Sequence, residues 1–557
     1  MEKIIKKIIK LDPKDINELA LIKRKLAKSF NISLPPHLIG TGASGAKLTK
    51  LAPIRCGGLL PNIKLLAAYR QLLKNKKIKR NLKLETLFKK RAVRTLSGVA
   101  VIAVLTKPYP CPGKCFYCPS EKKMPKSYLS NEPAVMRAIL CEFDPYKQVK
   151  TRLDSLEITG HLTDKVELII MGGAWTCLPG KYQTWFVKRC FDALNNKTFK
   201  TLPQAQNFNE KAKHRCVSLT LETRPDYINE QEIKRMRQLG CTKVEIGAQT
   251  LDDSILQLNQ RGHNAEEIIR ATKILKDAGF KVCYHMMPNL PGSDLKKDLE
   301  TFKKLFNDSD FRPDYLKIYP CVVTKNSPLY KAWKQGEYKP YSEKSLLELL
   351  IKIKKIIPPY VRVSRLIRDI PSNSIEAGNK VSNLRELIQK EMNKRGERCR
   401  CIRCREIKNL KFQNSNLKLK ILSYPASKGR EYFLSFEDVK NDKLIAFLRL
   451  RLSDDNSEIL KLLPELSGAA MVREIHTYGL QVPIDKKNKS AAQHFGFGKK
   501  LMREAEKIAK KQSFKKMAVI SGIGAREYYQ KLGYKLEGTY MVKSFSRINS
   551  INCPSIP

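Results

Sequence analysis

Between residues 96 and 370 the sequence alternates short apolar runs with segments of helical periodicity. Several runs are apolar on both faces, as strands covered by helices must be. Helical spacing of apolar residues lies between them, for example over 266–278 and 345–356. Repeated strand and helix units predict an α/β fold, either a parallel sheet or a full or partial TIM-like (β/α) barrel with its chemistry at the strand carboxyl ends. The predicted strands are Gly98–Leu105, Val166–Met171, Cys216–Glu222, Lys243–Gln249, Lys281–Met286, Tyr315–Tyr319 and Tyr360–Leu366.

The pattern differs on both sides of this region. Residues 1–95 predict a basic helical region, and the polar residues 371–416 predict a connector. From residue 417 strands follow one another directly, which predicts a separate α+β domain over 417–557. Its expected elements are strands at 417–423, 431–436, 445–452 and 469–477, a helix at 498–511, a strand at 517–521, a short helix at 526–532 and two final strands.

Charge is the unusual feature of the composition. The 557 residues include 106 Lys and Arg against 54 Asp and Glu, a net charge of +52. Such a surplus favours a polyanionic partner, with RNA or DNA ahead of anionic lipid. Between Lys74 and Arg94 ten basic residues accompany one acid, Glu85. We interpret this segment as a nucleic-acid contact, the alternative being an ordinary solvated helix face.

The same composition bears on the compartment. We expect no membrane association, because the sequence has no run of about 18 apolar residues and no signal peptide at its start. Six of the 15 cysteines lie in two tight clusters. An odd number of cysteines arranged in this way favours intracellular metal chemistry over a disulfide framework, and we expect a cytoplasmic location.

The first cysteine cluster, CPGKCFYC at Cys111–Cys118, follows the first predicted barrel strand. A structural zinc would need a fourth ligand nearby, so a zinc knuckle is the weaker alternative. Three cysteines around a [4Fe–4S] cluster leave one iron open to a substrate. The predicted cluster ligands are Cys111, Cys115 and Cys118.

This spacing, with an aromatic residue before the last cysteine, resembles the radical S-adenosylmethionine (SAM) superfamily. The resemblance implies that SAM chelates the open iron through its amine and carboxylate. Polar groups and glycines at the predicted strand ends would form a ring around the barrel mouth, although each one alone could be a loop salt bridge or a helix cap. We expect this ring to bind SAM and substrate through Gly172, Gly173, Glu222, Arg224 and Gln249, with Lys317 as a candidate catalytic residue.

The second cysteine cluster, CRCIRC at Cys399–Cys404, lies in the predicted connector between arginines. Thiolates with basic neighbours suit zinc, which would staple the connector between the two domains. Free buried cysteines and a second iron–sulfur cluster are the alternatives. The predicted zinc ligands are Cys399, Cys401 and Cys404, with no fourth ligand identified.

A glycine-containing loop, QHFGFGK at Gln493–Lys499, directly precedes the predicted helix 498–511. Backbone N–H groups at a helix N-terminus bind anions, and the glycines give a pyrophosphate room. In its order of elements this domain resembles the GNAT N-acetyltransferase fold, whose loop grips coenzyme A. The resemblance places the strand end EIHT beside the pantetheine arm, with His476 as a wall residue. It also places the phenol of Tyr528 or Tyr529 near the thioester sulfur, the alternative being that both are core aromatics.

Radical SAM cysteines and a GNAT domain in one chain resemble the catalytic subunit of Elongator and its stand-alone archaeal and bacterial relatives. The resemblance covers about residues 92–545 and includes ETRPDY at Glu222–Tyr227 and CRCIRCRE. It implies an acyltransferase that uses acetyl-CoA and SAM radical chemistry to place a carboxymethyl group on C5 of the tRNA wobble uridine, position 34. The expected acetyl-CoA contacts are Lys165, Glu474, Ile475, His476, Thr477, Gln493, Gly496, Phe497, Gly498, Lys499 and Tyr529.

Three further expectations concern assembly and alternatives. The compact spacing from Cys111 to Cys115 is typical of prokaryotic members, so we expect a stand-alone or homodimeric protein. A protein lysine acetyltransferase with a structural iron–sulfur cluster is the runner-up, although a peptide substrate would need neither the net charge nor a SAM site. A non-catalytic RNA-binding scaffold is disfavoured by the glycine loop and the tyrosine pair.

Overall fold

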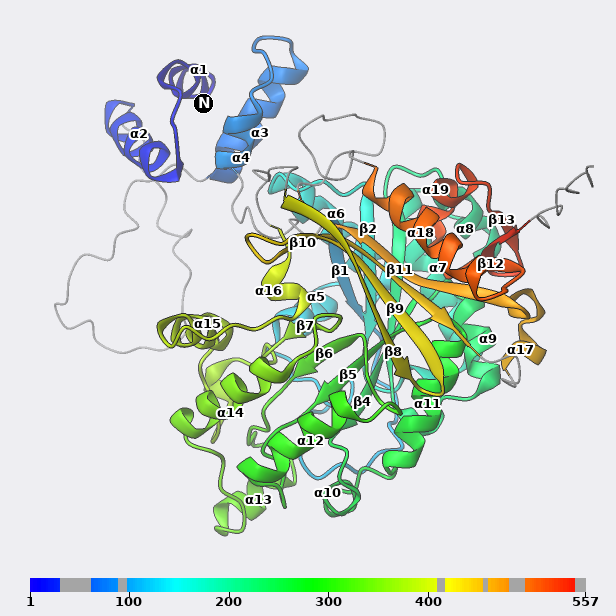
Figure 1. The fold of residues 1–557 in the computed structure, drawn as a ribbon. Helices are drawn as coiled ribbons and strands as arrows, with labels where there is room; N and C mark the ends of the chain where they lie inside the picture. Colours follow the sequence, from blue (N-terminus) through cyan, green and yellow to red (C-terminus); the bar gives the residue numbers. More distant parts are fainter. Residues whose placement is uncertain (31–61, 89–97, 408–415, 454–458, 480–495, 546–557) are drawn as a thin grey trace, which may run out of the picture. The chain divides into compact units, whose positions relative to one another are not determined.

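The computed structural model describes residues 1–30, 62–88, 98–407, 416–453, 459–479 and 496–545 (Figure 1). The chain divides into two compact units, Met1–Leu96 with Arg152–Thr163, and Ser97–Thr151 with Asp164–Pro557. Gln493 and residues 89–94 of the basic segment lie outside the described residues. Within the described ranges, the helices are too short or too polar to cross a membrane.

The first unit contains α1 (Glu2–Leu11), α2 (Ile16–Ser29), α3 (Asn62–Lys74) and α4 (Leu82–Phe88). Isoleucines at helical spacing bury one face of α1 in the core of this unit. Tyr69 of α3 meets Phe88 of α4 edge to face, with ring centroids 5.9 Å apart. The six basic residues of the 74–83 segment are all exposed, and three of them pair with acids: Lys77 with Glu2, Arg80 with Glu85 and Lys83 with Asp12.

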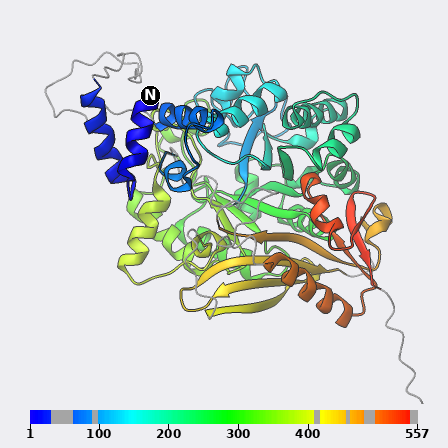
Figure 2. The ribbon, with the colours of Figure 1, turned by 90° about the horizontal axis from the view of Figure 1, so that it is seen from above.

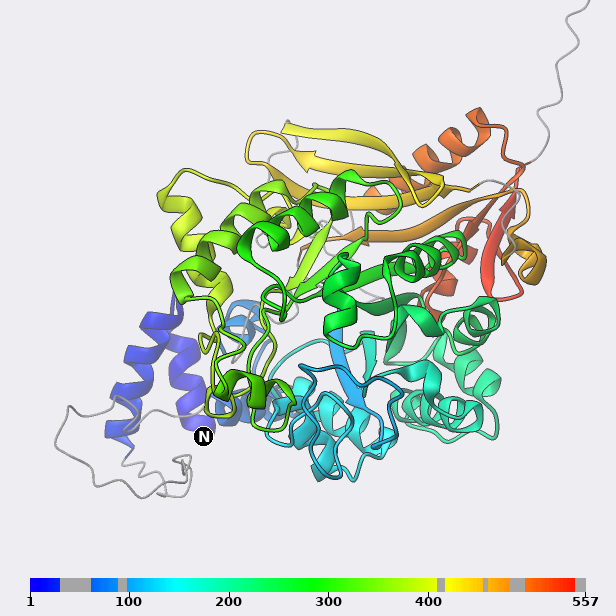
Figure 3. The same ribbon diagram turned by 90° about the horizontal axis from the view of Figure 1, so that it is seen from below.

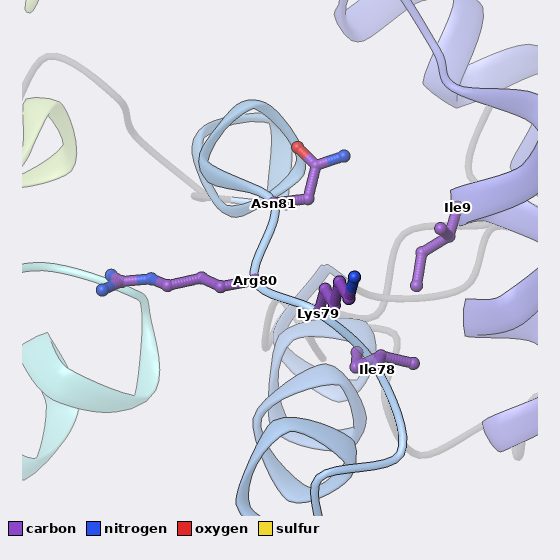
Figure 4. A pocket seen from close by; sticks show the side chains of 5 residues that line it. All are labelled: Ile9, Ile78, Lys79, Arg80 and Asn81. Atoms are coloured by element: carbon purple, nitrogen blue, oxygen red, sulfur yellow. The ribbon is translucent and has the colours of Figure 1, made fainter.

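A pocket of about 540 Å³ lies in this unit between α1 and the segment joining α3 to α4 (Figure 4). Its lining is Ile9, Ile78, Lys79, Arg80 and Asn81. Figure 4 shows Arg80 extending away from Ile9, where it pairs with Glu85 at 2.9 Å. The pocket contains none of the cysteines or glycine loops that the sequence singles out.

The second unit begins with a parallel sheet of seven strands in the order β1 to β7, so each strand pairs with its neighbour in sequence. This arrangement confirms the predicted partial (β/α) barrel. The residues of β2 alternate between half-buried and buried positions, as a strand with two different faces requires. The strands are β1 (Ala100–Leu105), β2 (Lys165–Met171), β3 (Arg215–Thr223), β4 (Lys243–Gln249), β5 (Lys281–Met286), β6 (Tyr315–Ile318) and β7 (Arg362–Arg365).

Helices connect these strands, and their starts carry sequence signals. Asn264 and Glu267 form a capping box at the start of α11, and Asp294 caps α12. The α-helices are α5 (Pro133–Leu140), α6 (Pro145–Ile158), α7 (Gly180–Asn195), α8 (Leu202–Asn209), α9 (Glu230–Gln238), α10 (Asp253–Leu258), α11 (Ala265–Asp277), α12 (Leu295–Asn307), α13 (Leu329–Lys334), α14 (Glu343–Ile356), α15 (Leu384–Lys394) and α16 (Ile402–Arg405).

A second sheet of seven strands follows, in the order β13-β14-β12-β11-β10-β9-β8. Its pairs are antiparallel except β11 with β12, which confirms the predicted α+β domain. Figures 2 and 3 show this sheet, yellow to red, alongside the green strands of the first. Its elements are β8 (Leu417–Ala426), β9 (Gly429–Asp438), β10 (Lys443–Leu452), α17 (Ile459–Leu462), β11 (Ala469–Thr477), α18 (Phe497–Lys511), β12 (Lys516–Val519), α19 (Arg526–Gln530), β13 (Lys535–Glu537) and β14 (Tyr540–Ser544).

Buried ion pairs join the two sheets. Arg473 of β11 donates both terminal nitrogens to Asp314, which directly precedes β6, at 2.8 and 2.6 Å. Its Nη2 also lies 3.0 Å from Oε2 of Glu431 on β9. All three side chains are completely buried. Such charges are tolerated away from water only when the pairing is nearly complete.

The neighbouring strand β10 adds two more arginines to this network. Arg449 Nε donates to Glu474 Oε2 at 2.9 Å, and Arg451 Nη2 donates to Asp277 Oδ1, at the end of α11, at 2.6 Å. Burial would raise the pKa of Asp314, but Arg473 and Arg449 outweigh it and hold that pKa below its usual value. The amino ends of the barrel strands are therefore held against the second sheet by charge.

Two glycines allow a second close contact between the domains. A Cβ atom at Gly522 would overlap the carbonyl oxygen of Val217 on β3, and one at Gly524 would lie 2.5 Å from the Cβ atom of Arg215. Arg215 Nη1 pairs with Glu527 Oε2 at 2.6 Å, at the start of α19. The barrel thus positions the helix that carries the tyrosine pair.

Replacing Arg473 with Met should destabilise both sheets together. Asp314 and Glu431 would each lose a buried cation, and breaking one partner of such a network costs about 3 kcal/mol or more. Urea unfolding with hydrogen-exchange mass spectrometry should show protection lost in both sheets in one transition. The control Arg395→Met breaks the exposed contact with Glu348 and should shift the midpoint little. Unchanged stability, or a loss of protection confined to the second sheet, would contradict the conclusion that Arg473 joins the two sheets.

Candidate functional site

The predicted cluster cysteines lie on the loop after β1, at the carboxyl edge of the barrel sheet. Cys115 and Cys118 are buried, and Cys111 is half-buried. Arg261 Nη1 donates to Cys115 Sγ at 3.2 Å. Burial raises the pKa of Cys118 to about 11, so its thiolate needs a nearby cation.

A second guanidinium, that of Arg224, lies against the same loop. Its Nη1 atom is buried and has no hydrogen-bond partner among the described residues. A Cβ atom at Gly113 would overlap this nitrogen and lie 3.4 Å from Cys115 Sγ. Arg224 is oriented by Asp226 Oδ2 at 2.7 Å and by the carbonyl oxygen of Arg261 at 2.5 Å. Three thiols with two adjacent guanidiniums fit an anionic [4Fe–4S] cluster that keeps one iron for a ligand.

The predicted SAM contacts gather several buried polar atoms without partners. Gly172 has φ +135° and Gly173 has φ +99°, and a Cβ atom at Gly172 would overlap Thr106 Oγ1. Among the described residues Thr106 Oγ1, Gln249 Oε1 and Asn259 Oδ1 are buried without a hydrogen-bond partner. Unpartnered buried polar atoms are rare, so this group at one sheet edge suits a polar ligand such as SAM.

Lys317 lies in a cluster of charged side chains on the inner side of the barrel sheet. Its Nζ atom contacts Glu222 Oε1 at 3.3 Å and also Glu245 Oε2. His285 Nε2 is 2.9 Å from the same Glu245 oxygen, and Tyr128 donates its hydroxyl to Glu222 Oε2 at 2.8 Å. The structure therefore brings together two predicted residues, Glu222 and Lys317, and adds three that were missed.

The missed residues Glu245 and His285 carry a weak sequence signal. Lys243 and Glu245 alternate with apolar residues on β4, and Lys281, Cys283 and His285 alternate with apolar or aromatic residues on β5. Charged residues on one face of each strand mark an inner face unlike that of a strand buried in apolar surroundings. Burial would raise the pKa of Glu245, but Lys317, His285 and Lys243 hold it well below its usual value. Although Glu245, Cys283 and His285 converge within 4.8 Å, these lysines already neutralise the carboxylate, so we interpret the group as an ion cluster.

The second cysteine cluster is compact. The sulfur atoms of Cys399, Cys401 and Cys404 lie within 4.8 Å of one another, closer than those of the first cluster. Lys354 Nζ is 3.6 Å from Cys404 Sγ. Hydrogen bonds from Cys399 and Cys401, together with Lys354 and Arg385, lower the pKa of Cys404. The donor set supplies three of zinc's four ligands, and the described residues add no further His, Cys, Asp or Glu to the group.

The predicted acetyl-CoA contacts surround a divergence between two strands. Among the described residues β11 pairs with β12 from Ala469 to Val472, while its last residues pair with β10. The two strands therefore diverge at Glu474–Thr477, where the Glu474 carboxylate binds Arg449 and Tyr315. His476 packs on Tyr478 at 4.4 Å and on Phe447, which suits a wall residue.

The helix that follows begins at the predicted coenzyme A loop. Gly496, with φ +71°, directly precedes α18, whose first residue Phe497 packs on Phe436 at 5.0 Å, while Lys499 is exposed. A Cβ atom at Gly498 would lie 2.6 Å from the hydroxyl of Tyr528. A strand that diverges from its neighbour beside a glycine-led helix N-terminus fits the pantetheine and pyrophosphate of coenzyme A.

The two tyrosines have different surroundings. The hydroxyl of Tyr528 is buried without a partner among the described residues, and burial raises its pKa to about 12. Tyr529 packs edge to face on Tyr528 and Tyr534, with centroids 5.1 and 6.2 Å apart. Tyr528 is therefore the phenol that faces the start of α18.

The two predicted cofactor regions lie at opposite ends of one strand. Lys165 begins β2, is partly buried, and pairs in register with Arg215, the residue that contacts α19. Gly172 follows the other end of β2. Six residue steps of about 3.3 Å separate these ends by about 20 Å. A reaction that uses both regions must span this length.

Family models match both domains of the chain. The Radical SAM superfamily model covers residues 109–305, the Radical_SAM C-terminal domain model covers 313–394, and the Acetyltransferase (GNAT) family model covers 403–534. With the two cofactor regions described above, these matches define a radical SAM enzyme that carries an acetyltransferase domain.

Known proteins narrow the class further. The chain is 49% identical to "tRNA uridine(34) acetyltransferase" of Methanocaldococcus infernus over 82% of its length and 88% of that protein. It is 40% identical to human "Elongator complex protein 3" over 82% of its length and 86% of that protein. The solved structure of M. infernus Elp3 without its N-terminus superposes with a TM-score of 0.70 at 45% identity, covering 81% of this chain and 100% of that one. The chain belongs to the family that includes tRNA uridine(34) acetyltransferase and Elongator complex protein 3, and it is an acyltransferase.

Replacing Gly172 with Ala should abolish SAM binding. The new Cβ atom would overlap Thr106 and force a backbone angle that side chains rarely adopt, which together cost more than the 1–3 kcal/mol of backbone strain alone. Gly336→Ala is the matched control, because Gly336 has φ +80° with no atom within 4 Å of a new Cβ. Equilibrium dialysis with labelled SAM should show loss for the first variant and retention for the second. Equal binding by both variants would remove Gly172 from the site.

Proposed function

We propose that the chain modifies the wobble uridine of tRNA, using acetyl-CoA and SAM to place a carboxymethyl group on C5 of uridine 34. The observation that carries this proposal is that both predicted cofactor regions lie in one compact unit. Within this unit the buried ion pair of Arg473 and Asp314 joins the two domains. The names of the relatives supply the RNA substrate. The net charge of +52 supports a polyanionic partner.

The residues of the barrel would hold and orient two cofactors, the [4Fe–4S] cluster and SAM. Cys111, Cys115 and Cys118 would bind the [4Fe–4S] cluster, with Arg261 donating to a ligand sulfur. Thr106, Gln249 and Asn259 would hydrogen-bond SAM beside the Gly172–Gly173 turn. When bound, the cluster and SAM supply one-electron chemistry, and acetyl-CoA supplies the two-carbon unit. Lys317, held by Glu222 and Glu245, places a cation on the inner side of the barrel, where it would orient the substrate.

The second domain would hold acetyl-CoA along β11 and at the start of α18. We assign the phenol near the thioester to Tyr528, because its hydroxyl is buried, unpartnered among the described residues and directed at Gly498. Tyr529 would support it by packing. Lys165 would reach the cofactor from the amino end of the barrel.

The remaining features have supporting roles. Zinc at Cys399, Cys401 and Cys404 would fix the segment after the barrel. The basic helices of residues 1–95 would contact tRNA, and the functional division would follow residues 96–370, 371–416 and 417–557. We propose that the protein acts in the cytoplasm, as a monomer or a homodimer rather than as a subunit of a larger complex.

The direct test is nucleoside mass spectrometry. Anaerobically reconstituted protein, SAM, a reductant, doubly ¹³C-labelled acetyl-CoA and tRNA should yield a labelled carboxymethyluridine at position 34. Acetylation of a lysine peptide with no modified uridine would instead support the runner-up, a protein lysine acetyltransferase.

In the same assay Tyr528→Phe should lower product formation by about 10²–10³-fold, the typical loss for one donor to a developing charge. Tyr529→Phe is the matched control and should retain most activity, since it removes a hydroxyl from the neighbouring ring, which is more deeply buried than that of Tyr528. Binding of acetyl-CoA should be close to normal in both variants. The reverse order of the two tyrosines would overturn this assignment.

A further inference from the structure

Four side chains form an aromatic and basic patch at the open end of the barrel, here called the mouth patch: Lys107, Tyr109, Tyr182 and Trp185. Trp185 is 44% exposed and Tyr109 is 40% exposed. Single exposed aromatic residues are common on protein surfaces, but contiguous ones beside cations mark interaction sites. The reaction proposed above gives these residues no role.

The Tyr182 and Trp185 rings of the mouth patch are held in place before any ligand binds. Tyr182 and Trp185 lie one turn apart on α7, with centroids 5.5 Å apart and planes 35° apart. Trp185 also packs edge to face on Phe186 at 6.4 Å. The backbone N–H of Lys107 donates to the Tyr182 hydroxyl at 3.1 Å, and its ammonium lies 5.1 Å from the Tyr182 ring centroid. Little side-chain entropy would therefore be lost on binding.

The mouth patch adjoins the cluster loop. Lys107 is the second residue after β1. Tyr109 is two residues before Cys111, so the Cα atoms of Tyr109 and Cys111 are at most about 7 Å apart. On the other side of the patch, the short turn Trp175–Cys177 follows the Gly172–Gly173 turn and leads into α7. A ligand on the patch would sit beside the entrance to the SAM region.

The chemistry of the patch suits unpaired nucleobases. Flat aromatic faces stack on bases of any sequence, and lysines nearby attract the phosphates. Among the described residues neither Lys107 nor exposed Lys181 forms an ion pair with a carboxylate, so both charges are available to a phosphate. Acidic Asp192 on the same helix is buried and already paired with Lys188 and Arg189.

We propose that the mouth patch stacks unpaired nucleotides of an RNA loop, with Trp185 as the main platform, and so presents a neighbouring base to the barrel. This inference rests on the proposed function for its choice of RNA. It adds the mode of recognition, which is stacking on single-stranded bases at the barrel mouth. Duplex RNA, whose bases are already stacked, would gain nothing from the patch.

The test compares two RNA probes on three variants. The probes are a tRNA anticodon stem–loop and a blunt RNA duplex of equal length. Trp185→Ala should weaken binding of the stem–loop by about 10- to 100-fold, the usual loss for one base–aromatic stack, and leave duplex binding unchanged. Trp185→Phe keeps a ring and should stay within about threefold of the native protein. Thermal unfolding of each variant checks that the fold is intact.

The matched control is Phe208→Ala. Phe208 is also 44% exposed, and its ring centroid lies 5.2 Å from that of Phe199, with Lys197 over the ring. It lies on α8, which leads into the amino end of β3, whereas the mouth patch follows the carboxyl end of β1. This variant should bind both probes normally. Native stem–loop affinity in Trp185→Ala, or an equal loss on the duplex, would overturn the proposal.

The outcomes separate this inference from the proposed function. If the native protein binds the stem–loop through Trp185 but produces no modified uridine, stacking stands and the proposed reaction fails. If modified uridine forms at the native rate in Trp185→Ala, the reaction stands and the stacking platform is rejected.

Discussion

The structure depends on a buried network of charges between the barrel and the acetyltransferase sheet. Arg473 and Asp314 make a bidentate pair at 2.6 and 2.8 Å with no exposure to water. Desolvating these groups is expensive, and the cost is offset only while both domains are in place, because the arginines come from one sheet and two of the acids, Asp314 and Asp277, from the other domain. The barrel and the acetyltransferase domain are therefore parts of one cooperative unit, and neither is expected to keep its native structure alone.

This joint fixes the relation between the two cofactor regions. It holds the amino ends of the barrel strands against β11, while the glycines of the 522–524 turn seat α19 on β3. The phenol of Tyr528 is thus placed by the barrel as well as by its own domain. The cluster loop and the Gly172–Gly173 turn lie at the other end of the same strands, about 20 Å away along β2. The inner face between them carries the Lys317, Glu245 and His285 cluster, which makes that length of sheet polar.

Much of this could be predicted from the sequence where the signal is local. β4, β5 and β11 have the predicted limits, because apolar runs bounded by turn residues report on strands directly. The cysteine spacings and the glycine loop are local too. The arginines of β10 and β11 could not be assigned, since an arginine in a strand has the same pattern whether it meets water or a buried acid far away in sequence, such as Asp314. The same holds for Glu245 and His285, and for the choice of Tyr528 over Tyr529, which depends on the contact with Gly498. The mouth patch required the exposure of Trp185 to be known.

The central claim is that both halves of one chain serve a single reaction. Mixing two variants tests it most directly: Cys115→Ala, which lacks a predicted cluster ligand, and Tyr528→Phe, which lacks the phenol proposed for the thioester. Each variant is given SAM, reductant, labelled acetyl-CoA and tRNA, alone and in an equimolar mixture, and modified uridine is measured by mass spectrometry. The account predicts no more product from the mixture than from the sum of the separate variants. Recovery of a large share of native activity in the mixture would show that the two sites act in separate chains and would contradict it.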